Sequence, residues 1–217
     1  MYATSEKNKT INLALFDFDG TLCTKDSFTG FIFYTLSKRH IMRKGLKILP
    51  WIQAYYLKLY PADAMRAKLF NTMFKGNSAK QLQQLGQEYA QTLVKNLDTQ
   101  LFQRLLQHQA QGDKVVLVSA SIDLYLKPVC ELLNIDLICT QVEIHNGFIT
   151  GQYSTPDCSS EQKKIRVHEA YHLNDYAHVY AYGNSYEDLQ MFSLADSCYM
   201  VGEDQQLPRL ADVKKLA

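Results

Sequence analysis

Five short apolar runs, separated by longer stretches with helical periodicity, place the strongest constraint on the fold. An apolar run of this length, bounded by polar residues, is typical of a strand that is buried on both faces. Strands that alternate with helices predict an α/β fold with a doubly wound, mostly parallel sheet. The predicted strands are residues 11–16, 115–120, 137–140, 179–182 and 197–201.

The stretches between these runs carry signals for the ends of helices. Asp98 is suited to cap a helix and Gly112 to end it, with leucines at helical spacing between them. Further helices are predicted for residues 123–134 and 186–194. The pair Asn146-Gly147 predicts a hairpin with a tight turn.

Residues 25–97 interrupt the alternation, because they contain no convincing strand and are rich in Leu, Tyr, Gln, Lys and Phe. We expect this segment to be a helical module inserted after the first strand. The predicted organisation is therefore a core made of residues 1–24 and 98–217, with a helical cap at residues 25–97.

The first part of this segment, residues 28–60, contains basic residues and no acidic ones. Three roles fit this composition. The segment can contact an anionic membrane surface, it can bury its aromatic rings while its lysines stay solvated, or it can attract an anionic soluble substrate. The basic residues are Lys38, Arg39, Arg43, Lys44, Lys47 and Lys58, and the aromatic ones include Phe31, Phe33, Tyr34, Trp51, Tyr55 and Tyr56.

Overall composition argues against several other classes of protein. The formal net charge of +1 gives no global electrostatic basis for binding nucleic acid. The five cysteines are scattered without a C-x-x-C pair, which favours reduced thiols over a zinc site or a disulfide framework. Residues 1–10 lack the apolar centre of a signal peptide, and no apolar stretch reaches the ~18 residues of a spanning helix. We therefore expect a cytoplasmic protein.

The string Asp17-Phe18-Asp19-Gly20-Thr21 directly follows the first predicted strand. In extended backbone, residues two apart point the same way, so Asp17 and Asp19 are expected to share a pocket at the edge where open α/β sheets bind ligands. Two close carboxylates favour a bound cation, and Mg²⁺ prefers such oxygen ligands. Asp17 can then attack phosphorus, while Asp19 protonates the leaving oxygen and later activates water.

Residues 16–22, FDFDGTL, resemble the first motif of the haloacid dehalogenase (HAD) superfamily of hydrolases. The resemblance implies a Rossmann-like core, Mg²⁺ as cofactor and a phosphomonoester as substrate. It makes Asp17 the nucleophile and Asp19 the general acid and base. The layout is most similar to the branch with a helical cap after the first motif, which includes phosphoserine phosphatases.

Phosphate binding is implied for residues near the second motif. Ser119, at the end of the second predicted strand, and the neighbouring backbone at Ala120 correspond to the family's phosphate site. Gly20 permits a sharp turn beside the same site. Asp26 either contacts the substrate, as an acidic residue does in phosphoserine phosphatases, or caps a helix that begins near Ser27.

The family's lysine corresponds to Lys163 or Lys164. Its implied role is to screen charge between the nucleophile and the phosphate. Lys163 is preferred, because its distance from Cys158 resembles an N-C-x-G-x-x-K pattern of one branch of the family.

The last motif is residues 183–188, GNSYED, where the family usually has an aspartate at the position of Asn184. An asparagine offers a carbonyl oxygen but no charge, so Asp188 gains importance for metal binding. The expected metal ligands are Asp17, Asp19, Asn184 and Asp188.

These features predict a magnesium-dependent phosphomonoester phosphatase with an aspartyl-phosphate intermediate. The expected substrate is phosphoserine-like or another small phosphomonoester. Three alternatives stay open: a phosphatase for lipid phosphates such as phosphatidylglycerophosphate at a membrane surface, a phosphotransferase that delivers the phosphoryl group to an alcohol, and a catalytically weak module that binds phospho-ligands.

Overall fold

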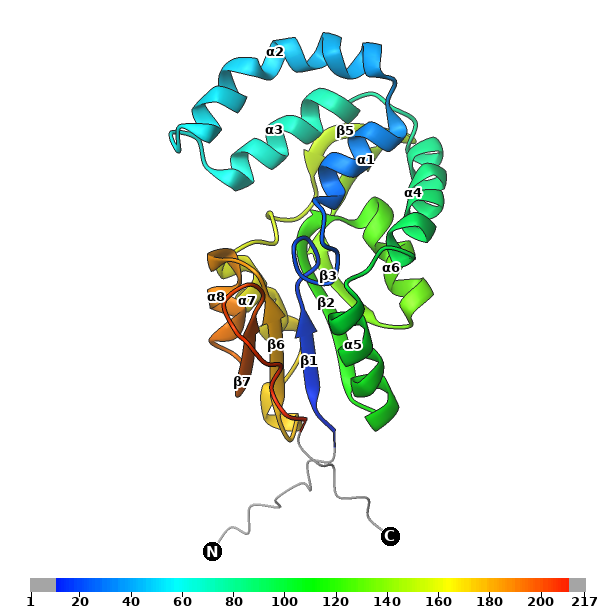
Figure 1. Ribbon diagram of the computed structural model, residues 1–217. Coiled ribbons are helices and arrows are strands. Elements are labelled where there is room, and N and C mark those ends of the chain that lie inside the picture. Colours follow the sequence, from blue (N-terminus) through cyan, green and yellow to red (C-terminus); the bar gives the residue numbers. More distant parts are fainter. Residues whose placement is uncertain (1–10, 211–217) are drawn as a thin grey trace, which may run out of the picture.

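The computed structural model describes residues 11–210, and a five-stranded parallel sheet forms the centre of this part of the chain (Figure 1). The strand order is β3-β2-β1-β6-β7, and every neighbouring pair is parallel. The predicted α/β fold is confirmed, and each predicted strand is present with its ends shifted by at most two residues. The strands are β1 (Leu13–Phe16), β2 (Lys114–Ile122), β3 (Asp136–Thr140), β6 (Val179–Gly183) and β7 (Ser197–Met200).

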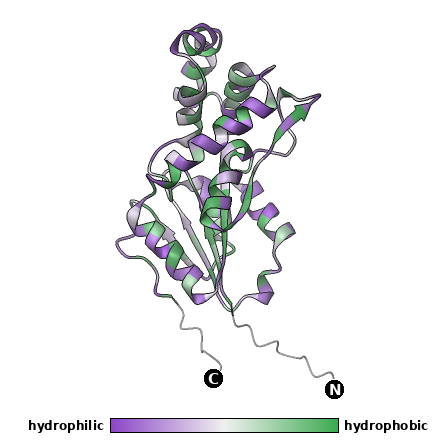
Figure 2. Ribbon diagram, turned by 90° about the vertical axis from the view of Figure 1, so that its right-hand side faces the viewer, coloured by the Kyte–Doolittle hydropathy of each residue, from purple (hydrophilic) through white to green (hydrophobic). Residues whose placement is uncertain are grey.

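Helices cover both faces of the sheet, which explains why the strands are continuous apolar runs. Ala14 and Phe16 of β1 face one side, where α5 (Thr99–Gln111) and α6 (Asp123–Leu133) pack. Leu13 and Leu15 face the other side with α7 (Glu161–Ala170) and α8 (Leu189–Phe192). All four β1 side chains are fully buried. The helices present both hydrophobic and hydrophilic residues, as Figure 2 shows, because each has one buried and one exposed side.

The local signals for helix ends are borne out in α5. The carboxylate of Asp98 accepts a hydrogen bond of 2.9 Å from the backbone N–H of Leu101, and Gly112 ends the helix with φ of 79°. The predicted helix at 186–194 is wrong in part, since a single 3-10 turn precedes the short α8. Helix α7 was not predicted, because its sequence is mostly polar and charged.

The predicted hairpin is also present, formed by β4 (Val142–His145) and β5 (Phe148–Tyr153). Asn146 and Gly147 both have positive φ, 49° and 80°, as a primed two-residue turn requires. The hairpin connects to the inserted segment through backbone hydrogen bonds, since Gly76 N–H donates to Ile149 at 2.8 Å and Ile149 N–H donates to Asn77 at 2.9 Å.

Within the described residues, the segment between β1 and α5 is helical. It forms α1 (Ser27–Thr35), α2 (Lys38–Tyr56), α3 (Ala62–Phe74) and α4 (Ala79–Val94). These helices lie beyond the carboxyl end of β1, and α2 is at the top of the molecule in Figure 1. Helix α4 packs along α6 at Gly86, where an added Cβ would lie 2.1 Å from the backbone oxygen of Leu124.

Across residues 11–210, the structure contains no helix with the length and apolar character needed to cross a membrane. The sequence expectation about residues 1–10 and a signal peptide lies outside the described residues.

Candidate active site

Asp17 lies directly after β1 and is held by two donors. The hydroxyl of Thr21 donates to Oδ2 at 2.9 Å, and Nζ of Lys163 donates to Oδ1 at 2.6 Å. The Asp17 side chain is only 9 % exposed, and it lines the cavity. Burial has the largest effect on the pKa of Asp17 and raises it to about 6. The Lys163 ammonium lowers this pKa, and the Asp188 carboxylate raises it further. Lys163 thus favours the ionised form of Asp17, which is the form that can act as a nucleophile.

Lys163 projects from α7 and joins two carboxylates. Besides Asp17, its Nζ donates to Oδ1 of Asp188 at 2.5 Å. The side chain is 2 % exposed. Burial alone would lower the pKa of Lys163, but the two carboxylates outweigh burial and hold that pKa above its ordinary value. Lys163 is thus a fixed positive charge beside Asp17, whereas the adjacent Lys164 is not among the described residues that line the cavity.

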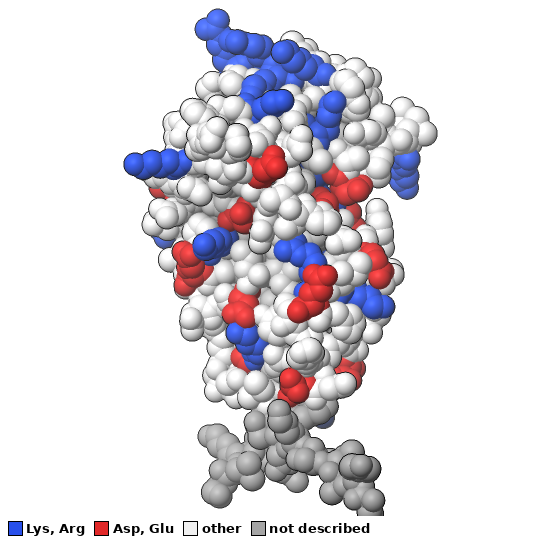
Figure 3. All heavy atoms as spheres, turned by 180° about the vertical axis from the view of Figure 1, so that it is seen from behind, with Lys and Arg blue, Asp and Glu red and all other residues white. Residues whose placement is uncertain are grey.

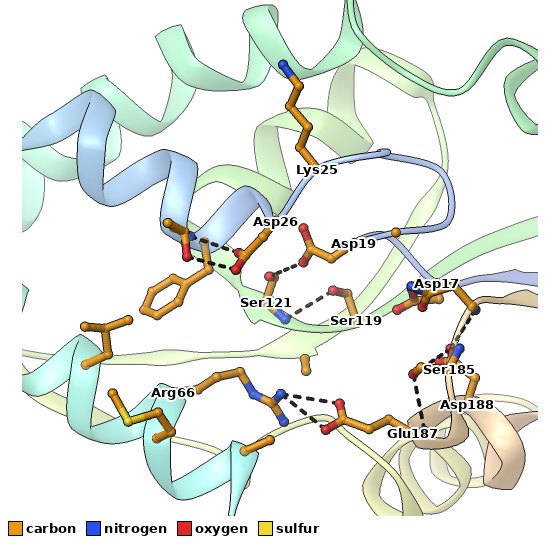
Figure 4. A pocket seen from close by; sticks show the side chains of 18 of the residues that line it. Asp17, Asp19, Lys25, Asp26, Arg66, Ser119, Ser121, Ser185, Glu187 and Asp188 are labelled. Atoms are coloured by element: carbon orange, nitrogen blue, oxygen red, sulfur yellow. Dashed lines mark hydrogen bonds and ion pairs between the residues drawn. The ribbon is translucent and has the colours of Figure 1, made fainter. Parts of the chain in front are cut away.

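Asp19 lines the same cavity as Asp17, as predicted, but its carboxylate has different hydrogen-bond partners. The Asp19 carboxylate accepts a hydrogen bond from Ser27 N–H at 2.6 Å. It also accepts one from the Ser121 hydroxyl at 2.5 Å, which Figure 4 shows. The alternation of extended backbone ends with β1 at Phe16, and the chain then turns. Burial raises the pKa of Asp19 although Ser121 and Ser27 oppose the rise, which favours the protonated form of an acid catalyst.

Asp19 is also connected to the inserted segment, because Ser27 is the first residue of α1. The Ser27 hydroxyl donates to the phenol oxygen of Tyr125 at 3.0 Å, and the hydroxyl of Tyr89 in α4 donates to the Ser27 carbonyl at 3.1 Å. The sequence did not single out Ser27, Ser121 or Tyr125. The motif S-A-S at the end of β2 was the available signal for Ser121.

The residues expected to bind phosphate line the same cavity as the two aspartates. Ser119 is buried, and its Oγ accepts a hydrogen bond of 3.1 Å from the Ser121 N–H, while Ala120 lies between them. Gly20 has φ of 79°, and an added Cβ there would lie 1.9 Å from Nδ2 of Asn184. A side chain at position 20 would therefore collide with Asn184 in addition to straining the turn.

Asp188 and Asn184, two of the residues predicted to bind the metal, line the same cavity as Asp17. Oδ2 of Asp188 accepts backbone hydrogen bonds from Asn184 at 3.0 Å and from Ser185 at 3.1 Å, which leaves Oδ1 with Lys163. Among residues 11–210 no cluster of three or more His, Cys, Asp and Glu side chains has metal-binding geometry. Asn184 and backbone oxygens would have to complete a ligand set around the carboxylates.

The charge of the site suits a divalent cation. The carboxylates of Asp17, Asp19 and Asp188 line the cavity together with Lys163, which pairs with Asp17 and Asp188, so these four side chains carry more acidic than basic groups. The donors are carboxylate and amide oxygens, which Mg²⁺ prefers. The residues present therefore fit Mg²⁺, which Asp17 and Asn184 would help to hold, while Asp188 fixes the loop through the backbone N–H groups of Asn184 and Ser185. The carboxylate of Asp19, also predicted as a ligand, already accepts hydrogen bonds from Ser27 and Ser121.

Asp26 caps α1, which is one of the two roles considered for it. Its Oδ1 accepts from Thr29 N–H at 2.9 Å and its Oδ2 from the Thr29 hydroxyl at 2.8 Å. Both carboxylate oxygens are thus used within the first turn, although Asp26 also lines the cavity.

Arg66 is a cavity residue that the sequence analysis missed. It projects from α3 and pairs with Asp157 and Glu187 of the core (Figure 4 shows the pair with Glu187). Its partners are 91 and 121 residues away in the chain, so no local spacing could reveal the cluster.

The cavity has a volume of about 540 Å³ and lies between the core and the inserted helices. The aspartates and Ser119 form its polar end. Its other end is mostly apolar and comes from α1, α2 and α3, through Phe28, Ile52, Tyr55, Tyr56, Met65 and Leu69. The site can therefore hold a phosphate at the sheet edge and a larger, partly apolar group under the helices.

Comparison with known proteins agrees with this geometry. The family model of haloacid dehalogenase-like hydrolases matches residues 14–193. Protein CicA of Caulobacter vibrioides is 30% identical over 202 residues, which cover 89% of this chain and 87% of that protein. A histidinol-phosphatase of Neisseria meningitidis is 26% identical over 219 residues, covering 94% and 96%. The structure of a probable phosphoserine phosphatase from Vibrio cholerae shares the fold, with a TM-score of 0.64, 19% identity and coverage of 85% and 54%.

Proposed function

Because the chain belongs to the haloacid dehalogenase-like hydrolases, we propose that it is a magnesium-dependent phosphomonoester phosphatase with an aspartyl-phosphate intermediate. One observation carries the proposal: Lys163 donates to both Asp17 and Asp188 in a cavity that also contains Asp19 and Ser119. An ionised carboxylate beside a fixed cation, with a separate acid nearby, is what two-step phosphoryl transfer needs. The histidinol-phosphatase relative adds support for phosphomonoesters as substrates.

In the first step, an oxygen of Asp17 attacks phosphorus and the bond to the leaving alcohol breaks. Asp19 gives its proton to the departing oxygen, and its raised pKa suits it to this role. The products of the step are the free alcohol and an acyl phosphate on Asp17. Lys163 and the Ser119 hydroxyl hold the phosphoryl oxygens and the carboxylate in line.

In the second step, Asp19 is ionised and removes a proton from a water molecule. The resulting hydroxide attacks phosphorus, the bond between phosphorus and the Asp17 oxygen breaks, and inorganic phosphate and the Asp17 carboxylate are released. Asp19 returns to its protonated form. Bound Mg²⁺ would supply charge neutralisation between the Asp17 carboxylate and the phosphoryl oxygens.

We propose that residues 25–97 act as a cap over this site. Ser27 N–H at the start of α1 holds Asp19, and Arg66 of α3 pairs with Asp157 and Glu187 of the core. Closing helices over the phosphate excludes water and brings specificity residues to the substrate.

The leading substrate class is a small phosphomonoester whose alcohol has an apolar or aromatic part. A cavity of about 540 Å³ with an apolar end has room for more than a short polar side chain. The same apolar end favours a lipid phosphate as the second candidate. A panel containing phosphoserine, histidinol phosphate and phosphatidylglycerophosphate, compared by kcat/KM, separates these classes.

The decisive experiment is Asp17→Asn, with p-nitrophenyl phosphate as substrate. The variant should fold normally, as judged by circular dichroism and Tm, and should lose roughly 10⁴-fold or more in kcat. Asp175→Asn, which changes an exposed aspartate outside the cavity, is the matched control and should keep full activity. Wild-type turnover by the Asp17 variant would exclude the nucleophile assignment.

Two further assays address the remaining alternatives. If competing alcohols such as glycerol capture most of the phosphoryl group, the protein is a phosphotransferase. If no phosphomonoester is turned over but phosphate analogues bind, it is a binding module.

A further inference from the structure

Helix α2 carries apolar side chains on the side that faces away from the rest of the molecule. Met42, Leu46 and Leu49 of the helix and its C-cap residue Leu57 recur at helical spacing, and their exposed fractions are 67%, 69%, 46% and 68%. We call these four residues the outer α2 stripe. The opposite side of the helix has its own apolar contact, because Ile48 is only 2% exposed. Thus α2 has two apolar sides, and the described part of the chain covers one of them.

Further exposed apolar residues occur at the last position of α2 and just beyond the helix. Tyr56 is 79% exposed and Leu59 is 77% exposed. Several large apolar side chains exposed side by side do not stabilise a monomer in water. Such a patch is typical of a surface that binds a protein or a membrane.

Cations flank the stripe along one edge of the helix. Arg39, Arg43 and Lys47 follow each other at intervals of four residues, so they lie on neighbouring turns of the helix beside the leucines. No acidic residue occurs between residues 28 and 60. Figure 3 shows that basic side chains gather at the end of the molecule that carries α2.

The basic surface extends into the groove between α2 and α3. This groove has a volume of about 360 Å³, and Nζ of Lys68 lies 4.2 Å from the centre of the Trp51 ring. The lysines along the groove are Lys44, Lys47, Lys68 and Lys75.

We infer that the outer α2 stripe docks the protein on an anionic lipid bilayer. Apolar side chains flanked by cations are what a helix needs to lie at the boundary between headgroups and acyl chains of an anionic leaflet. A second copy of the chain fits less well, because pairing this face with itself would bring Arg39, Arg43 and Lys47 of both copies together without acidic partners.

Docking through α2 places the bilayer against a helix that also forms the active-site cavity. Ile52, Tyr55 and Tyr56 of α2 line that cavity. The docking inference does not depend on phosphatase activity, and it is tested without any substrate.

The test is co-sedimentation of the full chain with phosphatidylcholine vesicles, with and without phosphatidylglycerol. Binding is expected only with phosphatidylglycerol, and it should weaken as salt is added. Leu46→Glu should abolish it, and Arg39→Gln and Arg43→Gln should each lower the partition coefficient about fivefold. All three positions are exposed, so the variants should keep the Tm of the wild type.

The matched controls lie on α6 of the core. Leu132→Glu changes a leucine that is 55% exposed, and Lys127→Gln removes an exposed cation. Both should bind vesicles like the wild type. The inference is wrong if the wild type does not sediment with anionic vesicles, if it binds neutral vesicles equally well, or if the α6 variants lose binding as strongly. It is also wrong if sedimentation equilibrium shows a dimer that Leu46→Glu separates while no vesicle binding is found.

Discussion

Arg66 of α3 forms a two-point ion pair with Asp157 of the core. Nε lies 2.8 Å from Oδ2 and Nη2 lies 2.8 Å from Oδ1, which is the parallel geometry in which arginine binds a carboxylate most specifically. Nη1 reaches Glu187 at 3.3 Å. Burial alone would lower the pKa of Arg66, but the two carboxylates outweigh it and raise that pKa. One side chain thus joins the inserted helices to two points of the core.

This pair predicts a measurable coupling between Arg66 and Asp157. A double-mutant cycle with Arg66→Gln and Asp157→Asn, measured by urea unfolding, should give about 1 kcal/mol, because the pair is mostly buried and bidentate. The single variants should also lower kcat/KM, since the cap would close less often. A coupling near zero would mean that the pair does not hold the cap.

The pair Lys114–Asp136 provides the control for that cycle. Its atoms are 2.6 Å apart, but the two side chains are 39% and 43% exposed. Solvent screening should reduce its coupling to a few tenths of a kcal/mol, in spite of the short distance.

Lys163→Met should destabilise the protein and abolish turnover. The change leaves Asp17 and Asp188 buried beside each other without a cation, and loss of one partner from a buried ion cluster costs about 3–5 kcal/mol. Lys164→Met, one residue along α7 and partly exposed, should change neither quantity appreciably. Urea unfolding and p-nitrophenyl phosphate hydrolysis measure the two effects, and similar losses in both variants would contradict the assignment of Lys163.

Asn184→Asp should strengthen the dependence of the site on Mg²⁺. The two side chains have the same shape, so the aspartate fits against Gly20, but it adds a fourth carboxylate to the site. In excess EDTA the variant should be less stable than the wild type. The Mg²⁺ concentration for half-maximal activity should fall about tenfold, which corresponds to about 1.4 kcal/mol of added metal affinity. An unchanged Mg²⁺ titration would mean that position 184 does not contact the ion.

The sequence was sufficient for features that depend on neighbouring residues. The apolar run before Asp17 predicted β1, and Asp98 and Gly112 predicted the two ends of α5, because burial and capping act within a few residues. The Asn146-Gly147 turn belongs to the same class, since its backbone angles are set by the two residues themselves.

Features that depend on three-dimensional packing were harder to predict. The Asp19 carboxylate is held by Ser27 and Ser121, which are 8 and 102 residues from Asp19. The choice between Lys163 and Lys164 depends on which side of α7 faces the sheet, where Val167 is buried with Lys163. The exposed Ile165 on the same helix obscures that pattern.

Asp113→Asn should destabilise the protein at neutral pH and much less in acid. Asp113 accepts from His108 at 2.7 Å and from Asn12 N–H at 3.1 Å. Burial alone would raise the pKa of Asp113, but these bonds outweigh it and hold the pKa below its ordinary value. The stabilisation is therefore complete above the ordinary aspartate pKa of about 3.9 and is lost as the pH falls through the lower folded-state pKa. Urea unfolding should show a loss of about 2 kcal/mol at pH 7 that shrinks below pH ~4, and a pH-independent difference would contradict this account.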